Sequence, residues 1–192
     1  MKRSLTTSRG EILLREADPV DAVQFRDLRL GALQDSPAAF SADYQRNLSY
    51  PPKHWEDMLT MHADEATIFL AYHEDNLIGM TGIARGGSPK TRHSATVWGV
   101  YVKPEWRGLH IAEGLIRSCF DWAKARGIVI AKLGVATVNE AAIRCYERCG
   151  FKTYGIEPGA LFHEGRYYDF HMMSCSLNTE LVSNYWISSR AV

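Results

Sequence analysis

The spacing of apolar residues changes near the middle of the chain. Residues 97–102 form a β-branched and aromatic run that predicts a strand, and Pro104 ends this run. From Ile111 onward the apolar residues fall at helical intervals, which predicts a helix that extends to about residue 123. A short turn must therefore join the strand directly to the helix.

Arg107 and Gly108 lie in this turn, just before the predicted helix. A helix N-terminus carries unpaired N–H groups and about half a positive charge, so it favours an anion such as a phosphate. The turn is therefore a candidate pyrophosphate-binding corner.

The same patterns predict elements along the rest of the chain. Helices are expected from Asp18-Pro19 to about Asp35 and around Trp55, Met58 and Leu59. Further strands are expected at residues 12–15, 66–72, 77–85, 131–136, 152–157 and 166–177. The order predicts a mixed α/β (α+β) fold with one parallel crossover, from the strand that ends at Val102 to the strand at residues 131–136.

A second cluster of informative residues occupies positions 139–151. Asn139 is a favourable N-cap and Gly150 a favourable helix stop, so a helix is expected between them. Asn139 and Tyr146 lie about two turns apart, roughly 10 Å along the axis, and project from similar sides. Each residue alone is more often a cap or a core-edge side chain, but together they suit an extended ligand.

Composition limits the classes of function. The chain has 192 residues, 46% of them hydrophobic, which fits one domain over residues 1–192 with a core at about 10–177 and an appendage at 178–192. Lys plus Arg and Asp plus Glu both number 22, so no net charge attracts nucleic acid or a membrane surface. Without an apolar leader or a membrane span, we expect a cytoplasmic protein. Residues 185–187 (Tyr-Trp-Ile) are expected to dock on the body or on a second subunit, which would give a homodimer.

The four cysteines do not predict a metal site. Cys119, Cys145, Cys149 and Cys175 contain no Cys-x-x-Cys pair. The spacing of Cys145 and Cys149 invites a metal interpretation, but reduced cysteines that pack in the core are favoured over it.

The two clusters together resemble the GNAT superfamily of acetyl-CoA-dependent N-acetyltransferases. Residues 107–112 (Arg-Gly-Leu-His-Ile-Ala) match its Arg/Gln-x-x-Gly-x-Gly/Ala motif except at His110, and residues 139–151 match its Asn-x-x-Ala-x-x-x-Tyr-x-x-x-Gly-Phe pattern. The resemblance covers about residues 10–177 and extends to a large bacterial subgroup whose acceptors are mostly undefined. It implies a mostly antiparallel sheet with a central, splayed parallel strand pair, flanked by helices.

The resemblance also implies a set of residues that bind acetyl-CoA. The main-chain N–H groups that would hold the pyrophosphate are those of Arg107, Gly108, Leu109, His110, Ile111 and Ala112. The pantetheine arm would lie along the main chain at Val100, Tyr101 and Val102, beside a bulge at Gly99. Asn139 would contact the pantetheine, and Tyr146 would be the catalytic proton donor to the departing thiolate.

Two positions depart from the family pattern. His110 stands where glycine is usual, and we expect it to adopt a helical φ with its imidazole facing solvent. The strand at residues 94–102 has no Glu or His to act as a general base. Candidates elsewhere are His93, Glu164, Asp169 and His171, reached through a bound water.

The mechanism expected from this resemblance is direct attack by a neutral primary amine in a ternary complex. An acyl-enzyme on Cys145 is disfavoured because no His lies close in sequence. The acceptor would be a small-molecule or peptide amine, held by residues 28–50 and the loop before Arg166. Aromatic candidates for this cleft are Trp98, Tyr44, Tyr50, Phe162 and Tyr167. The alternative is a non-catalytic acyl-CoA-binding regulatory module.

Overall fold

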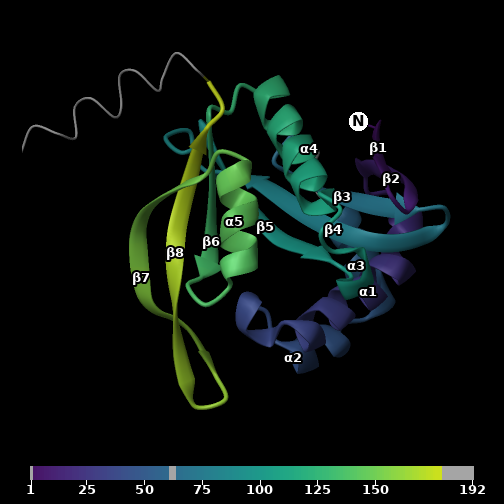
Figure 1. The fold of residues 1–192 in the computed structure, drawn as a ribbon, viewed down its shortest axis with the longest axis horizontal. Coiled ribbons are helices and arrows are strands. Elements are labelled where there is room, and N and C mark those ends of the chain that lie inside the picture. Colours follow the sequence, from purple (N-terminus) through teal and green to yellow (C-terminus); the bar gives the residue numbers. More distant parts are fainter. Residues whose placement is uncertain (1, 61–63, 179–192) are drawn as a thin grey trace, which may run out of the picture.

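The computed structural model describes residues 2–60 and 64–178, and one eight-stranded sheet organises them (Figure 1). Its strand order is β1-β2-β3-β4-β5-β6-β8-β7, and every neighbouring pair is antiparallel except β5 and β6. The strands are β1 (Lys2–Thr7), β2 (Gly10–Glu16), β3 (Ala66–His73), β4 (Asn76–Arg85), β5 (Ser94–Val102), β6 (Ile130–Ala136), β7 (Lys152–His163) and β8 (Arg166–Ser176). This arrangement confirms the expected mixed, mostly antiparallel sheet with a central parallel pair.

Helices cover the sheet from both sides. The α-helices are α1 (Ala22–Asp35), α2 (Tyr44–Leu48), α3 (Pro52–Leu59), α4 (Ile111–Ala125) and α5 (Glu140–Arg148). Short 3-10 helices are η1 (Pro19–Asp21), η2 (Pro37–Ala39) and η3 (Pro104–Trp106). Apolar residues of α4 and α5 belong to one buried cluster, and those of α1 and α3 to a second cluster on the other side of the sheet. None of the helices in the described ranges is both long and apolar enough to cross a membrane.

The parallel pair β5–β6 separates after a short ladder. Residues 94–96 of β5 face residues 130–132 of β6, and no pairing follows toward Val102. Gly99 has φ +65°, and the β4–β5 register shifts around it, so the expected bulge is confirmed. The Thr81 hydroxyl donates to the Trp98 carbonyl at 3.2 Å beside this bulge. The splayed pair that the family resemblance implied is therefore present.

The hydrophobic pattern missed elements in which few residues are apolar. Strand β1 has Leu5 as its only large apolar residue, and it pairs with β2 at the edge of the sheet. Helix α2 is only five residues long and lies between two predicted helices. The predicted docking of residues 185–187 concerns a segment outside the described residues.

A prediction follows from the packing of Trp98 on Gly82. A Cβ at Gly82 would lie 2.2 Å from the Trp98 ring, so Gly82→Ala forces the indole out of its site. Overpacking of this kind costs about 1–3 kcal/mol of unfolding free energy, which urea denaturation measures. Gly31→Ala in α1 is the control, because its Cβ meets nothing within 4 Å and alanine is the better helix former. An unchanged midpoint of urea denaturation for Gly82→Ala would contradict this packing of Trp98 on Gly82.

Candidate functional site

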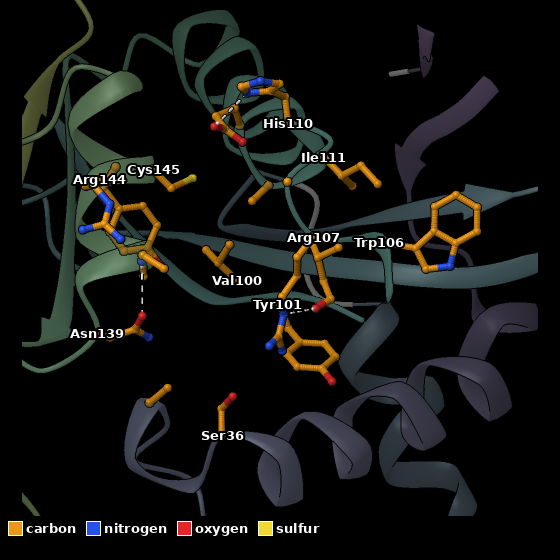
Figure 2. A pocket seen from close by; sticks show the side chains of 18 of the residues that line it. Ser36, Val100, Tyr101, Trp106, Arg107, His110, Ile111, Asn139, Arg144 and Cys145 are labelled. Carbon is orange, nitrogen blue, oxygen red and sulfur yellow. Dashed lines mark hydrogen bonds and ion pairs between the residues drawn. The ribbon is translucent and has the colours of Figure 1, made fainter. Parts of the chain in front are cut away.

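A cavity of about 550 Å³ opens where β5 and β6 separate (Figure 2). Its walls come from η2, the end of β5, the turn before α4, the first turn of α4, and α5. The lining residues are Ser36, Ala39, Phe40, Val100, Tyr101, Val102, Trp106, Arg107, Gly108, His110, Ile111, Ala112, Glu113, Asn139, Ala141, Ala142, Arg144, Cys145, Tyr146 and Arg148. Because η2 packs on one side of the sheet and α5 on the other, the cavity joins the two faces through the split.

Nearly all the predicted binding residues line this one cavity. Those brought together are Val100, Tyr101, Val102, Arg107, Gly108, His110, Ile111, Ala112, Asn139 and Tyr146. The exception is Leu109, whose side chain packs against the buried cluster of α4 and α5. Two motifs about 30 residues apart in the chain therefore form opposite walls of one space.

The turn before α4 presents unpaired N–H groups. Gly108 has φ +80° and His110 has φ +58°, so both residues occupy the left-handed region. Among the described residues, the N–H groups of positions 108–112 find no hydrogen-bond acceptor, whereas the N–H of Arg107 donates to the Pro104 carbonyl at 3.2 Å. The expected helical φ at His110 is wrong, because the turn reverses direction at this residue before the helix begins.

The side chain of Arg107 fixes the turn to its neighbours. Its Nε donates to the Val102 carbonyl at 3.0 Å, and its guanidinium forms an ion pair with Asp35 at the end of α1. This hydrogen-bonded guanidinium lowers the pKa of the Asp35 carboxyl. Arg107 also lies over the Tyr101 ring at 5.6 Å. The Arg107 guanidinium is therefore held by protein partners on both sides of the turn.

An ion pair joins the first turn of α4 to the last turn of α5. Glu113 accepts hydrogen bonds from Arg148 of α5 at 2.7 and 3.0 Å, and lies 3.1 Å from Nδ1 of His110. Burial opposes ionisation of Glu113, but the hydrogen bonds from Arg148, its own backbone and His110 lower its pKa. Arg144, paired with Glu140 at 3.0 Å, lies one turn from Arg148. Neither arginine was predicted as a binding residue, although their i,i+4 spacing places them on one face of α5.

Asn139 and Tyr146 occupy different depths of the α5 wall. The Asn139 side chain accepts from the Ala142 N–H at 3.2 Å, so its capping role is confirmed. Tyr146 is only 8% exposed and packs edge-on against Phe151. Burial raises the pKa of the Tyr146 phenol, so the hydroxyl stays protonated well above neutral pH.

Cys145 also contacts the cavity, but its thiol is poorly suited to attack. A hydrogen bond with Cys149 and burial raise the pKa of Cys145. A protonated thiol is a weak nucleophile, and this supports the packing role expected for it. No group of three or more His, Cys, Asp or Glu residues suited to a metal ion is found in the described ranges.

None of the four candidate bases lines the cavity. His93 precedes β5 at the end far from Val100, and Glu164 lies in the β7–β8 turn with φ +48°. Asp169 accepts from the Gly159 N–H at 2.8 Å. His171 faces Val135 across the β6–β8 ladder, and its buried Nδ1 has no hydrogen-bond partner within the described residues. The structure offers no direct base among them at the open end of β5.

The predicted aromatic residues do not form a common cleft. Tyr50 stacks on His54 with ring centroids 3.8 Å apart, and Phe162 packs on Tyr167 at 4.8 Å. Trp98 covers Gly82 instead of facing the cavity. The part of residues 28–50 that does reach the cavity consists of Ser36, Ala39 and Phe40.

Comparison with known proteins identifies the fold and the motifs. A family model described as "Acetyltransferase (GNAT) family" matches residues 31–151. The chain belongs to the GNAT acetyltransferase family. The match spans both motifs that form the cavity, from within α1 to the residue before β7.

Similar GNAT structures reproduce the fold over most of the chain. An acetyltransferase of the GNAT family from Streptococcus pneumoniae has a TM-score of 0.77 and 24% identity, and covers 86% of this chain and 99% of that one. The yncA protein of Salmonella typhimurium, a putative acetyltransferase solved with acetyl-CoA, has a TM-score of 0.72 and 20% identity over 87% and 94%. Because both sequence identities are below 25%, these structures show that the fold is shared.

Curated relatives match over shorter stretches. An uncharacterized N-acetyltransferase from Methanocaldococcus jannaschii is 36% identical over 70 residues, which are 36% of this chain and 31% of that protein. A mycothiol acetyltransferase from Brachybacterium faecium is 27% identical over 138 residues, 70% of this chain and 39% of that protein. The chain therefore spans about a third of the length of the curated relatives it matches.

The left-handed conformation of His110 gives a testable prediction. Both His110→Gly and His110→Ala remove the imidazole, but only alanine keeps a Cβ at a positive φ. We expect the glycine variant to be more stable than the alanine variant by about 1 kcal/mol in urea unfolding. Equal stabilities would contradict the turn geometry. Both variants should keep acetyl-CoA affinity, whereas a tenfold loss in both would show that the imidazole binds.

Proposed function

We propose that the protein transfers the acetyl group of acetyl-CoA to a primary amine. The observation that carries this proposal is the cavity that runs from the unpaired N–H groups before α4 to the open edge of β5 and the Tyr146 phenol. A pyrophosphate suits the first end, because oriented N–H groups and a helix N-terminus favour negative charge. An extended pantetheine arm suits the second, because β5 has no strand partner there on its β6 side.

The residues present fit acetyl-CoA along this whole path. Arg144 and Arg148 add positive charge on the α5 wall, and both are more than half exposed. Gly108 brings the main chain of the turn close to the cavity with no side chain in the way. The similar GNAT protein yncA was solved with acetyl-CoA as its cofactor, and this supports the same donor here.

The reaction needs a nucleophile, an oxyanion donor and a proton for the thiolate. The amine nitrogen attacks the thioester carbonyl carbon, the Val100 N–H stabilises the oxyanion, and the carbon–sulfur bond then breaks. Tyr146 donates its proton to the sulfur and regains one from water. Both residues line the cavity, on opposite walls.

Removal of a proton from the amine is assigned to water. Among the lining residues in the described ranges, Glu113 is the only carboxylate, and it is held by Arg148 at 2.7 Å. His110 lies at the phosphate end with its side chain 70% exposed. The neutral fraction of the acceptor amine should therefore control the rate as the pH rises.

Tyr146→Phe tests the proposed acid. Loss of a general acid lowers kcat by about 100-fold or more, while the Kd for acetyl-CoA stays unchanged. Thiol release and calorimetry measure the two quantities, and Tyr154→Phe on the exposed edge of β7 is the control. Because burial raises the pKa of Tyr146, the wild-type rate should not fall between pH 8 and 10. Full turnover by Tyr146→Phe would contradict the assignment.

Four single substitutions test the role of water. His93→Ala, Glu164→Ala, Asp169→Ala and His171→Ala should each keep the wild-type pH–rate profile, since none of these side chains lines the cavity. A pH–rate profile whose acidic limb shifts in one variant would identify the substituted residue as the base.

A panel of amines separates the enzyme from a non-catalytic acyl-CoA-binding module, which would bind acetyl-CoA without releasing its thiol.

A further inference from the structure

We propose that Arg29 binds a carboxylate of the acceptor, so that the substrate class is an amino acid acetylated on its amine. Arg29 is a buried cation that forms no ion pair within the described residues, and it lies beside the β5 bulge that borders the cavity. This inference rests on the proposed acetyl transfer and names the acceptor of that same site.

Arg29 is unusual among the arginines of the chain because it is buried and unpaired. It lies within α1 and is 8% exposed. Its Nε and Nη1 atoms are inaccessible to solvent and have no hydrogen-bond partner among the described residues. Burial lowers the pKa of Arg29, and no acidic group offsets this. A buried, unpaired charge is costly, so a ligand anion is the natural partner of this guanidinium.

The guanidinium lies next to the site of acetyl transfer. An added Cβ at Gly99 would meet Nη1 of Arg29 at 3.4 Å, which places the cation against the bulge. The guanidinium also lies over the Phe40 ring at 5.2 Å, and Phe40 lines the cavity. Val100, whose N–H is assigned to the oxyanion, follows Gly99 directly in the chain.

The side of the sheet also favours the acceptor over acetyl-CoA. Arg29 lies on α1, which packs with the cluster that contains Tyr101, whereas Tyr146 and α5 belong to the cluster on the other side. The phosphate-binding turn begins several residues beyond the bulge, after Val102. Arg29 therefore borders the end of the cavity where an amine must enter.

A carboxylate matches Arg29 better than other anions do. The planar guanidinium presents paired N–H donors that fit the two oxygens of a carboxylate. An α-amino acid carries its amine and carboxylate on one carbon, so a carboxylate held beside Gly99 leaves the amine next to Val100. The acid of α1 nearest the cavity, Asp35, is already paired with Arg107 and does not compete.

Stability separates a ligand-binding cation from a structural one. Arg29→Met keeps most of the packing volume and removes the unpaired charge, so we expect a melting temperature equal to or above that of the wild type. If Arg29 instead stabilised the fold, Arg29→Met would lower the melting temperature. Arg26→Met on the same helix is the matched control, because Arg26 is exposed and pairs with Asp27.

The decisive experiment compares amino acids with their carboxamides. Wild-type enzyme should prefer the acids by about 30-fold or more in kcat/KM, chiefly through KM, as expected for a charge-assisted hydrogen-bonded pair. Arg29→Met should abolish this preference, Arg29→Lys should retain part of it, and Arg26→Met should leave it unchanged. Equal use of acids and amides by the wild type, or a preference that survives in Arg29→Met, would overturn the proposal. A preference for phosphate-bearing amines would overturn the carboxylate assignment.

A binding measurement makes the inference testable apart from turnover. Calorimetry with N-acetyl-amino acids, the expected products, should show binding to wild type that is lost in Arg29→Met, while N-acetyl-amino acid amides bind neither protein. If no amine is acetylated, the proposed function fails, yet this binding pattern still supports an anion site at Arg29. Absence of binding to wild type would overturn that site. Should Arg29→Met fail to fold, Arg29→Lys provides the same comparisons with the charge kept and the planar fork removed.

Discussion

The short parallel ladder between β5 and β6 is the constraint on which the rest of the site depends. The two strands are paired only over residues 94–96 and 130–132, and from there to Val102 β5 is paired with β4 alone. Unpaired main-chain groups in the middle of a sheet are costly unless water or a ligand satisfies them. The split therefore creates the cavity and leaves the β6-facing edge of β5 open to water or a ligand.

The bulge at Gly99 connects this split to both faces of the sheet. Its positive φ and the register shift against β4 turn the strand so that Trp98 and Tyr101 face the α1 cluster while Val100 and Val102 contact the α4 cluster. Because of this bulge, residues of β5 on both faces of the sheet line the cavity. The turn that follows uses two more left-handed residues to present its N–H groups at the start of α4.

Much of this arrangement was readable in the sequence, and the exceptions have physical reasons. The switch from strand to helix spacing located the turn, and Asn139 and Tyr146 were expected at the same groove, whose cavity they line. The φ of His110 was missed because the residue is not a glycine, although the glycine usual at this position of the family motif is compatible with a left-handed conformation. Phe40 and Arg148 reach the cavity only because distant elements pack together. The sequence pattern around each residue predicts its own helix or turn, but not the cavity that this element borders. The predicted aromatic residues do not line the cavity: Tyr50 stacks on His54, and the exposed Phe162 and Tyr167 pack on each other in the β7–β8 hairpin.

Arg107 and Arg29 both lie near the cavity, but they differ in whether an acidic partner neutralises their charge. Arg107 is satisfied by Asp35 and by the Val102 carbonyl, so its charge stabilises the turn whether or not a ligand is present. Arg29 has no such acid among the described residues, although it is more deeply buried. A fold gains nothing in stability from a desolvated cation that it leaves unpaired. The arrangement becomes favourable only when the missing anion arrives with a ligand, and the position of Arg29 at the bulge makes that ligand the acceptor.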